Sequence, residues 1–341
     1  MTRAPVLVPD PLLRLRPLVE PELKAAVGRL HPTLARMGGY AFGWCAADGT
    51  SASAPGGKNV RSALALLAAE AAGGTARVAV PAAVAVELVH GFSLVHDDIM
   101  DGDELRRGRP TLWKAFGSGP AVLAGDAMLA LALSTVARTG LDTACTELAD
   151  SLGALMRGQA DDLAFESRPF TGPEAVTVDE YLAMARDKTG ALLGAGAAMG
   201  AAFAGAGSDT VAAYRRFGGE LGLAFQAVDD VLGIWGDPRR TGKPAGSDLA
   251  RGKKTLPLLS ALATATPASA RLARLLERPL TGDELHIAAA LVEEAGGRRH
   301  AQDHARTHHR RALHAMKSAA FRPGPAADLT ALATCLLRRT A

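Results

Sequence analysis

The sequence predicts an all-α fold, and three observations carry this prediction. Apolar residues recur three and four positions apart, as at Leu88, Phe92 and Val95, which keeps them on one face of a helix. The alternation of β-branched residues that makes strands is almost missing, and aromatic residues are only 4% of the chain. Clusters of Gly, Pro and small residues separate the helical stretches. We therefore expect ten or more helices.

The beginning of the chain differs from the rest. Residues 1–21 contain five prolines and show no helical period, which favours an extended, Pro-rich arm. From residue 22 onward the helical pattern continues without a stretch that resembles a linker between domains. We expect an arm over 1–21 and a single all-α domain over 22–341.

Composition excludes several classes of protein. With 341 residues, 48% of them hydrophobic and 21% charged, the chain can bury a core and is not disordered. A net charge of +3 gives no broad cationic field for nucleic acid. Three widely spaced cysteines favour neither a disulfide framework nor a zinc cluster, so we expect a cytoplasmic protein. The uncharged run at 190–207 is rich in Ala and Gly and predicts a buried helix, without stable membrane insertion.

Carboxylates gather at two places in the sequence. Asp97, Asp98 and Asp101 end an apolar helical run, and Asp97 and Asp101 share one face because they are four positions apart. Asp229 and Asp230 end a second such run about 130 positions later. Carboxylates this close repel one another unless a cation lies between them, and Mg²⁺ prefers oxygen ligands. The two pairs could face each other across a cavity and hold several Mg²⁺ ions and a diphosphate; a third pair, at 161–162, is expected to be structural.

Basic residues are interleaved with these carboxylates. They are Lys58, Arg61, Arg106, Arg107, Lys188, Lys243 and Lys253. Lys58 and Arg61 lie beside a predicted helix start, where backbone N–H groups favour anions. His90 lies seven residues before Asp97 on the same helix face and is expected to contact phosphate, whereas His96 is expected to hold an aspartate. Together these residues predict two diphosphate sites, one held through metal and one by basic side chains alone.

These motifs, in this order, resemble the trans-type isoprenyl diphosphate synthases from about residue 23 to the end. The resemblance rests on Gly56-Gly57-Lys58-x-x-Arg61, Glu87-Leu88-Val89-His90, the first aspartate motif with its trailing Arg106-Arg107-Gly108, Lys188-Thr189, Gln226-x-x-Asp229-Asp230 and Thr241-Gly242-Lys243. It implies an isoprenoid-synthase-type bundle around a deep central cavity, a homodimer and about three Mg²⁺ ions.

The resemblance also assigns roles to single residues. Metal ligation is implied for Asp97, Asp98, Asp101, Asp229 and Asp230. Binding of the allylic diphosphate is implied for Arg106, Lys188, Thr189, Gln226, Lys243 and Lys253. Binding of isopentenyl diphosphate is implied for Lys58, Arg61, His90 and Arg107. The candidate catalytic residues are Asp97, Asp98, Lys188 and Lys243. Two positions depart from the family pattern, since Gly233 stands where Asp is common and Ser62 where Pro is usual.

The implied reaction is a prenyl transfer of isoprenoid biosynthesis. An allylic diphosphate ionises, isopentenyl diphosphate attacks the carbocation, and a proton leaves. Phe92 and Ser93, just before the first aspartates, resemble the chain-length positions of archaeal-like geranylgeranyl diphosphate synthases, which implies a C20 product. Two alternatives remain: a catalytically silent partner subunit and a class I terpene cyclase on the same scaffold.

One further cluster is expected to have no catalytic role. His300, His304 and His308 are spaced four apart, as zinc ligands on one helix face could be. No cysteine or carboxylate pair completes a zinc shell, and neighbouring arginines oppose a cation. We interpret this stretch as a solvated basic helix.

Overall fold

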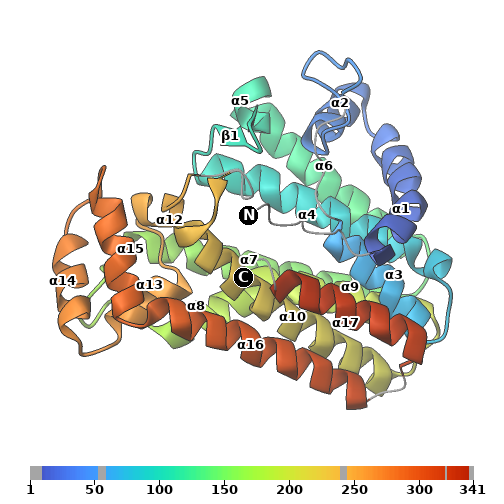
Figure 1. The fold of residues 1–341 in the computed structure, drawn as a ribbon. Helices are drawn as coiled ribbons and strands as arrows, with labels where there is room; N and C mark the ends of the chain where they lie inside the picture. Colours follow the sequence, from blue (N-terminus) through green and yellow to red (C-terminus); the bar gives the residue numbers. More distant parts are fainter. Residues whose placement is uncertain (1–9, 53–58, 239–243, 319–320, 338–341) are drawn as a thin grey trace, which may run out of the picture. The chain divides into compact units, whose positions relative to one another are not determined.

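A computed structural model describes residues 10–52, 59–238, 244–318 and 321–337, and in this part of the chain the protein is almost entirely helical (Figure 1). The predicted all-α fold of ten or more helices is confirmed. The helices are α1 (Asp10–Gly28), α2 (Pro32–Ala41), α3 (Val60–Ala71), α4 (Val80–Met100), α5 (Leu112–Phe116), α6 (Ser118–Ala137), α7 (Asp142–Ser167), α8 (Val178–Ala185), α9 (Ala191–Phe203), α10 (Ser208–Trp235), α12 (Ser247–Ala250), α13 (Leu256–Leu262), α14 (Pro267–Leu275), α15 (Glu284–Glu294), α16 (Gly297–Ala315) and α17 (Pro323–Leu337). Shorter elements are the 3₁₀ turns η1 (Ala76–Ala79) and η3 (Met316–Ser318), the π-turn η2 (Arg186–Gly190), and the antiparallel strands β1 (Leu105–Arg106) and β2 (Arg109–Pro110).

The prediction of an extended arm is wrong for residues 10–21. These residues form the first three turns of α1, although Pro17 and Pro21 lie inside the helix. Leu12, Leu15 and Val19 are buried at helical spacing, and burial of this apolar stripe outweighs the hydrogen bonds that the prolines cannot make. Residues 1–9 lie outside the described part of the chain.

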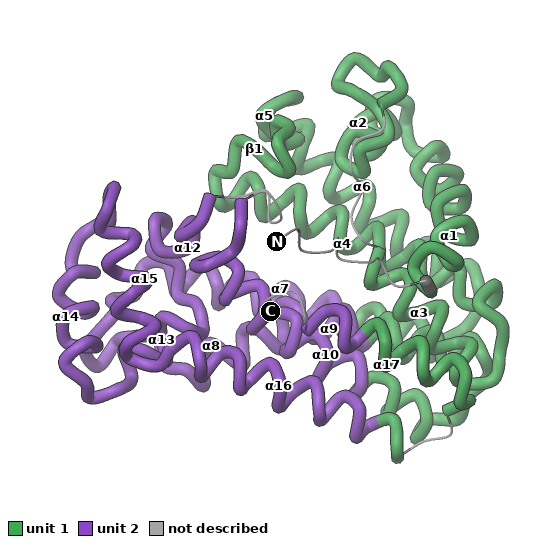
Figure 2. The backbone as a smooth tube through the Cα atoms, in the orientation of Figure 1, with its two compact units in different colours: residues 1–149, 195–215, 316–332 green, residues 150–194, 216–315, 333–341 purple. Residues whose placement is uncertain are grey.

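The chain divides into two compact units, coloured separately in Figure 2. Unit 1 contains residues 1–149, 195–215 and 316–332, and unit 2 contains residues 150–194, 216–315 and 333–341. Because each unit gathers distant segments, the division does not follow the order of the sequence. The single domain expected over 22–341 stays a prediction, as does the central cavity.

In unit 1, α4 is the central helix and packs most extensively against α6 and α3. Most of its side chains from Ala82 to Phe92 are buried. Small residues permit close approach elsewhere in this unit, since a Cβ at Gly200 would lie 2.1 Å from the carbonyl oxygen of Ala65. This packing fixes the position of the last turn of α4, which carries the first aspartates.

In unit 2, one apolar cluster joins α8, α10, α13 and α16. Tyr181, Val228, Leu256 and Ala301 are among its buried members, and a second cluster joins α12 to α15. Thr177 begins α8 with a capping box in which its side chain and that of Glu180 bond each other's backbone N–H groups. The last turns of α10, with the second aspartate pair, therefore rest on a packed core.

Two helices among the described residues are long and apolar enough to cross a membrane by length and composition alone. The stretch 76–100 is 67% buried within the structure, as a core helix would be. The stretch 118–137, which is α6, is only 33% buried. The uncharged run that begins at residue 190 forms α9, whose side chains from Leu192 to Ala202 are buried, which confirms the predicted buried helix.

Candidate functional site

The first aspartate motif occupies the last turn of α4. Asp97 and Asp101 lie one turn apart and are half-buried, and the backbone N–H of Asp101 closes the turn on the carbonyl of Asp97 at 2.8 Å. Asp98 is only 4% exposed and accepts two bonds from Arg106, from Nε at 2.8 Å and from Nη2 at 2.6 Å. Although burial opposes it, the bond to Asp98 raises the pKa of Arg106. The three aspartates therefore have two different environments.

Arg106 and Arg107 belong to the hairpin that follows α4. Arg107 has φ of 53° and Gly108 has φ of 75°, as in the two-residue type I′ turn that normally selects Asn-Gly. Arginine is strained in this conformation. Among the described residues, Arg107 and Asn59 are the only non-glycine residues with positive φ, and both adjoin the predicted isopentenyl diphosphate site. Strain of this kind is typical of functional positions.

Arg61, in the first turn of α3, donates from Nη1 to Nε2 of His90 on α4 at 3.3 Å. Arginine can only donate, so Nε2 of His90 accepts and the ring carries its proton on Nδ1. Burial, and then the charges of Arg61 and Arg107, hold the pKa of His90 well below its ordinary value. The imidazole is neutral at pH 7 beside a cluster of arginines, an arrangement that favours an anion. Lys58, predicted for the same site, lies outside the described residues.

Two hydrogen bonds account for the serine at position 62, where the family pattern usually has proline. The backbone N–H of Ser62 donates to Oε1 of Glu87 at 3.1 Å and its hydroxyl donates to the same oxygen at 2.7 Å. A proline at this position could make neither bond. The two bonds hold the N-terminal turn of α3, with Arg61, against α4, and they give the buried Glu87 its partner.

In unit 2, Lys188 and Thr189 lie on the π-turn η2 between α8 and α9. Two glycines let neighbouring helices approach this turn. A Cβ at Gly158 in α7 would lie 2.4 Å from the backbone nitrogen of Lys188, and one at Gly222 in α10 would lie 2.6 Å from the Cα of Gly190. Single π-turns within helices are frequent at functional sites.

Asp162 on α7 connects two of the predicted lysines. Nζ of Lys188 lies 2.6 Å from its carboxylate and Nζ of Lys253 lies 3.5 Å from it. Although burial opposes them, these two charges lower the pKa of Asp162. The expectation of a structural role for the pair at 161–162 overlooked this contact, which holds both cations in one place.

The second aspartate pair ends α10, and its members also differ. Asp230 is 3% exposed and accepts from Nε2 of Gln226 at 2.9 Å, from the backbone N–H of Leu256 at 2.9 Å and from the hydroxyl of Tyr181. Burial raises the pKa of Asp230 to about 6, against the effect of these donors. Asp229 is half-buried. Tyr181 was not predicted, although it lies two helical turns before Lys188.

Gly233 leaves room for a carboxylate from elsewhere in the chain. A Cβ at Gly233 would lie 1.9 Å from Oδ2 of Asp248, on α12. Any other residue at position 233 would displace Asp248. The carboxylate of Asp248 therefore lies against the last turns of α10.

The donor set fits Mg²⁺. Asp97, Asp101 and Asp229 offer hard oxygen ligands that are not fully buried, and Mg²⁺ is usually bound by one or two carboxylates together with water and substrate phosphates. Among the described residues, no group of three or more His, Cys, Asp or Glu side chains forms a ligand cluster by itself.

The two chain-length candidates lie on different sides of α4. Ser93 shares the face of Asp97, and its hydroxyl donates to the carbonyl of His90 at 3.0 Å. Phe92 lies about 140° around the helix from Asp97 and is 5% exposed. Its ring contacts His96 edge-on, with centroids 4.7 Å apart. His96 approaches Asp126 on α6 at 3.7 Å, so the aspartate beside it belongs to α6.

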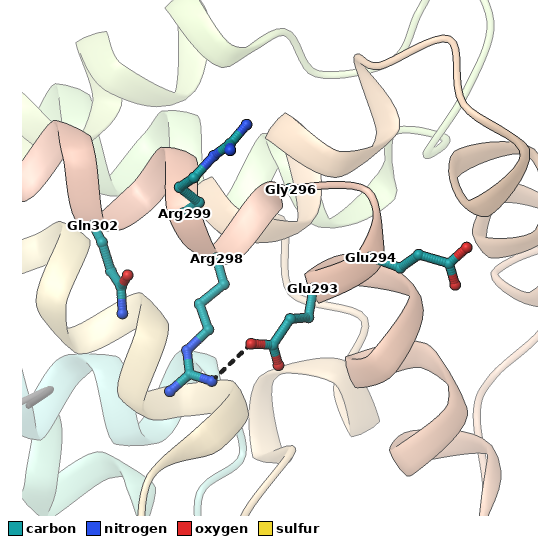
Figure 3. A pocket seen from close by; sticks show the side chains of 6 residues that line it. All are labelled: Glu293, Glu294, Gly296, Arg298, Arg299 and Gln302. Carbon is teal, nitrogen blue, oxygen red and sulfur yellow. Dashed lines mark hydrogen bonds and ion pairs between the residues drawn. The ribbon is translucent and has the colours of Figure 1, made fainter.

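Two other features of unit 2 contain none of the predicted catalytic or binding residues. His300, His304 and His308 form a column on α16 in which His308 bonds Glu220. A hollow of about 350 Å³ lies at the junction of α15 and α16. Figure 3 shows Arg298 turned toward Glu293, 3.1 Å away, and Arg299 pointing to the other side.

Each unit thus gathers a separate set of predicted residues. Unit 1 brings together Arg61 with His90 and Asp98 with Arg106. Unit 2 brings together Lys188 and Lys253 on Asp162, and Thr189, Gln226 and Asp230 in one hydrogen-bonded chain. Lys243, like Lys58, lies outside the described residues.

Comparison with known proteins identifies the family of the chain. Residues 44–293 match the polyprenyl synthetase family. Geranylgeranyl diphosphate synthase of Mycobacterium tuberculosis is 45% identical over 96% of this chain and 93% of its own length. The (2E,6E)-farnesyl diphosphate synthase of Mycobacterium bovis is 43% identical over 95% of this chain and 91% of its own. The crystal structure of a polyprenyl synthetase from Streptomyces coelicolor A3(2) superposes with a TM-score of 0.90 and 44% identity, covering 96% of this chain and 98% of that one. The chain belongs to the polyprenyl synthetase family.

Proposed function

We propose that the protein is a Mg²⁺-dependent trans-prenyltransferase that condenses isopentenyl diphosphate with an allylic diphosphate. Family membership supports prenyl transfer. The observation that carries the metal-dependent part is the unequal environment of each aspartate pair, in which one carboxylate is buried and bonded while its neighbour is half-buried. Such a half-buried carboxylate beside basic residues suits a metal–diphosphate complex.

The allylic substrate would be held by residues of both aspartate motifs. Asp97, Asp101 and Asp229 would ligate Mg²⁺, and bound Mg²⁺ supplies positive charge that makes pyrophosphate a better leaving group. Arg106, Lys188 and Lys253 add fixed positive charge, and Thr189 and Gln226 add neutral hydrogen-bonding groups. As the allylic C–O bond breaks, its electron pair stays with pyrophosphate and a carbocation is left.

Isopentenyl diphosphate would be bound by basic groups alone. Lys58, Arg61, His90 and Arg107 are the proposed contacts, and the neutral His90 would gain a proton or donate from Nδ1 when a diphosphate approaches. The double bond of this substrate donates its electron pair to the carbocation and forms the new C–C bond. A proton is then lost, and the departing pyrophosphate is the proposed base.

We propose a C20 product, geranylgeranyl diphosphate. Relatives of similar identity are named for both C20 and farnesyl products. The proposed chain length therefore rests on the residues that precede Asp97. The single bulky side chain there is Phe92, and Ser93 leaves space on the face of Asp97. Phe92→Ala should lengthen the product and Ser93→Phe should shorten it, as measured by chromatography of the dephosphorylated alcohols. An unchanged product from both variants would refute this assignment.

We propose that the enzyme is a cytoplasmic homodimer that associates through α6. Leu123 and Leu133 are 57% and 41% exposed on this helix, and Ala130 and Ala137 continue the same stripe at helical spacing. An apolar stripe of this length on a soluble enzyme is typical of an interface. Leu123→Glu with Leu133→Glu should yield monomers in size-exclusion chromatography with light scattering, whereas Ile287→Glu, on exposed α15, should not. An unchanged mass of the double variant would exclude α6.

The function is tested by incubation of the purified protein with Mg²⁺, isopentenyl diphosphate and dimethylallyl, geranyl or farnesyl diphosphate in turn. Elongated prenyl diphosphates are the expected products. Cyclised hydrocarbons would indicate a terpene cyclase, and the absence of any product would indicate a silent partner subunit. Either result would overturn the proposal.

A further inference from the structure

A chain of hydrogen bonds in unit 2 joins the π-turn to α10, α8 and α13. The hydroxyl of Thr189 donates to Oε1 of Gln226 at 2.7 Å. Nε2 of Gln226 donates to Oδ1 of Asp230 at 2.9 Å. Oδ2 of Asp230 accepts from the hydroxyl of Tyr181 and from the backbone N–H of Leu256. The chain thus starts at a predicted substrate residue and ends in the buried core.

The direction of these bonds fixes the Gln226 amide. An ionised carboxylate can only accept, so Asp230 requires the NH₂ side of the amide to face it. The carbonyl side must then face Thr189, whose hydroxyl supplies the matching proton. If the negative charge of Asp230 were removed, the amide could be reversed at little cost, because its two ends have nearly the same shape.

The same bonds occupy the second aspartate of the pair. Both oxygens of Asp230 are engaged by three donors, and its side chain is nearly inaccessible. Asp229 is half-buried. The first pair follows the same pattern, because Asp98 is buried on Arg106 while Asp97 is half-buried.

We propose that Asp230 and Tyr181 are positioning residues that hold the Gln226 amide for the allylic diphosphate. This inference rests on the function proposed above. In this orientation Gln226 has a second N–H for a phosphate oxygen, whereas the reversed amide would present its carbonyl oxygen and repel the substrate. The chemistry therefore predicts a defect in binding the allylic diphosphate, not isopentenyl diphosphate.

Four variants of the full chain test the proposal. Tyr181→Phe removes one hydroxyl, and Asp230→Asn removes the charge that orients Gln226. Asp229→Asn removes the proposed ligand. Tyr214→Phe is the matched control, because Tyr214 is also fully buried but its hydroxyl has no hydrogen-bond partner within the described part of the chain. Each variant is measured for both KM values, kcat and the Mg²⁺ concentration at half-maximal rate. Inorganic pyrophosphate is also titrated calorimetrically in the presence of Mg²⁺, which reports binding without turnover.

The expected results separate the two roles. Tyr181→Phe and Asp230→Asn should each raise KM for the allylic diphosphate about tenfold, the effect of one lost hydrogen bond, with KM for isopentenyl diphosphate and the Mg²⁺ requirement unchanged. Asp229→Asn should raise the Mg²⁺ requirement and weaken pyrophosphate binding by about tenfold or more. Tyr214→Phe should match the wild type. The proposal is overturned if Asp230→Asn shifts the Mg²⁺ requirement as much as Asp229→Asn, or if Tyr181→Phe leaves the allylic KM unchanged.

A second pair of variants keeps the test independent of folding of the Tyr181 and Asp230 variants. Thr189→Val breaks the other end of the hydrogen-bonded chain, and Thr189→Ser restores the hydroxyl. The valine variant should show the raised allylic KM and the serine variant should recover it; equal values for the two would contradict the proposal. If the wild type forms no elongated product, the proposed function fails, and the pyrophosphate titrations still decide the positioning roles.

Discussion

The aspartate pair on α4 and the pair on α10 each contain one buried carboxylate, but the groups that bond to it differ between the two pairs. In each, the second carboxylate is buried and the first is half-buried. Asp98 is bonded by a cation, Arg106, that lies eight residues further along the chain. Asp230 is bonded by neutral donors from α8, α10 and the start of α13. The α4 pair is partly neutralised by its own hairpin, whereas burial without a cation raises the pKa of Asp230 to about 6.

This difference predicts unequal costs when the partner is removed. Arg106→Met should destabilise the protein by about 3 kcal/mol, because it removes the cation that is bonded to the buried carboxylate of Asp98. Tyr181→Phe should cost only about 1 kcal/mol, because Asp230 keeps two neutral donors. Urea denaturation followed by circular dichroism measures both values. If the two costs are equal, the contrast between an ionic and a neutral partner is wrong.

The next largest effect is expected at Gly233, beside the α10 pair. A methyl group there cannot coexist with the carboxylate of Asp248 in its present place, so Gly233→Ala should cost about 1 kcal/mol through displacement of that side chain. It should also lower kcat. Gly207→Ala is the matched control, since no atom lies within 4 Å of its Cβ position. Wild-type stability in Gly233→Ala would show that Asp248 moves freely.

A smaller and opposite effect on stability is expected in the hairpin after the α4 pair. Arg107→Asn places the residue that type I′ turns prefer at a strained position, and should stabilise the protein by about 0.5 kcal/mol. The same change removes a proposed diphosphate contact, and KM for isopentenyl diphosphate should rise about tenfold. Thermal denaturation and steady-state kinetics check the two parts. A variant with normal KM would remove Arg107 from the site.

A separate effect, which depends on pH, is expected outside both pairs, on α16. Burial, then His308 and His300, lowers the pKa of His304 to about 4, with Arg311 also opposing and Glu220 favouring the charged form. Below pH 6.5 the His304 ring becomes protonated in the unfolded chain but stays neutral in the folded protein. The free energy of unfolding therefore falls as the pH is lowered toward 4. His304→Gln should abolish about 1 kcal/mol of this loss at pH 4.5, with no change in the Mg²⁺ requirement. A changed requirement would bring α16 into the site.

The sequence was sufficient for features that depend on local pattern. Helical spacing predicted the fold, and the Ala/Gly-rich composition after Gly190 predicted a buried helix. The order of the motifs placed Arg61 and His90 in one predicted site, and the two side chains are in contact. The extended arm was predicted wrongly over residues 10–21 because the five prolines of residues 1–21 were given more weight than the stripe formed by Leu12, Leu15 and Val19. Proline penalties are local, and only tertiary burial could outweigh them.

The residues that sequence reasoning missed act across long separations. Tyr181 reaches Asp230 over 49 positions and Ser62 reaches Glu87 over 25, and no period in the sequence encodes such pairings. The carboxylate of Asp248 lies in the space beside Gly233. The sequence showed that glycine stands at position 233, but not that Asp248 lies against it. The π-turn at Lys188 depends on the close approach of Gly158 and Gly222, which are 30 positions before and 34 positions after it in the chain.

The release of pyrophosphate as a function of Mg²⁺ concentration tests the central claim most directly. With isopentenyl and farnesyl diphosphates present, the wild type should release one pyrophosphate for each new C–C bond, and chelation of Mg²⁺ should stop both. Asp97→Ala and Asp229→Ala should each lower kcat/KM by about a thousandfold, while Tyr214→Phe stays at the wild-type rate. Wild-type turnover in both aspartate variants, or release of pyrophosphate that does not require Mg²⁺, would contradict the account.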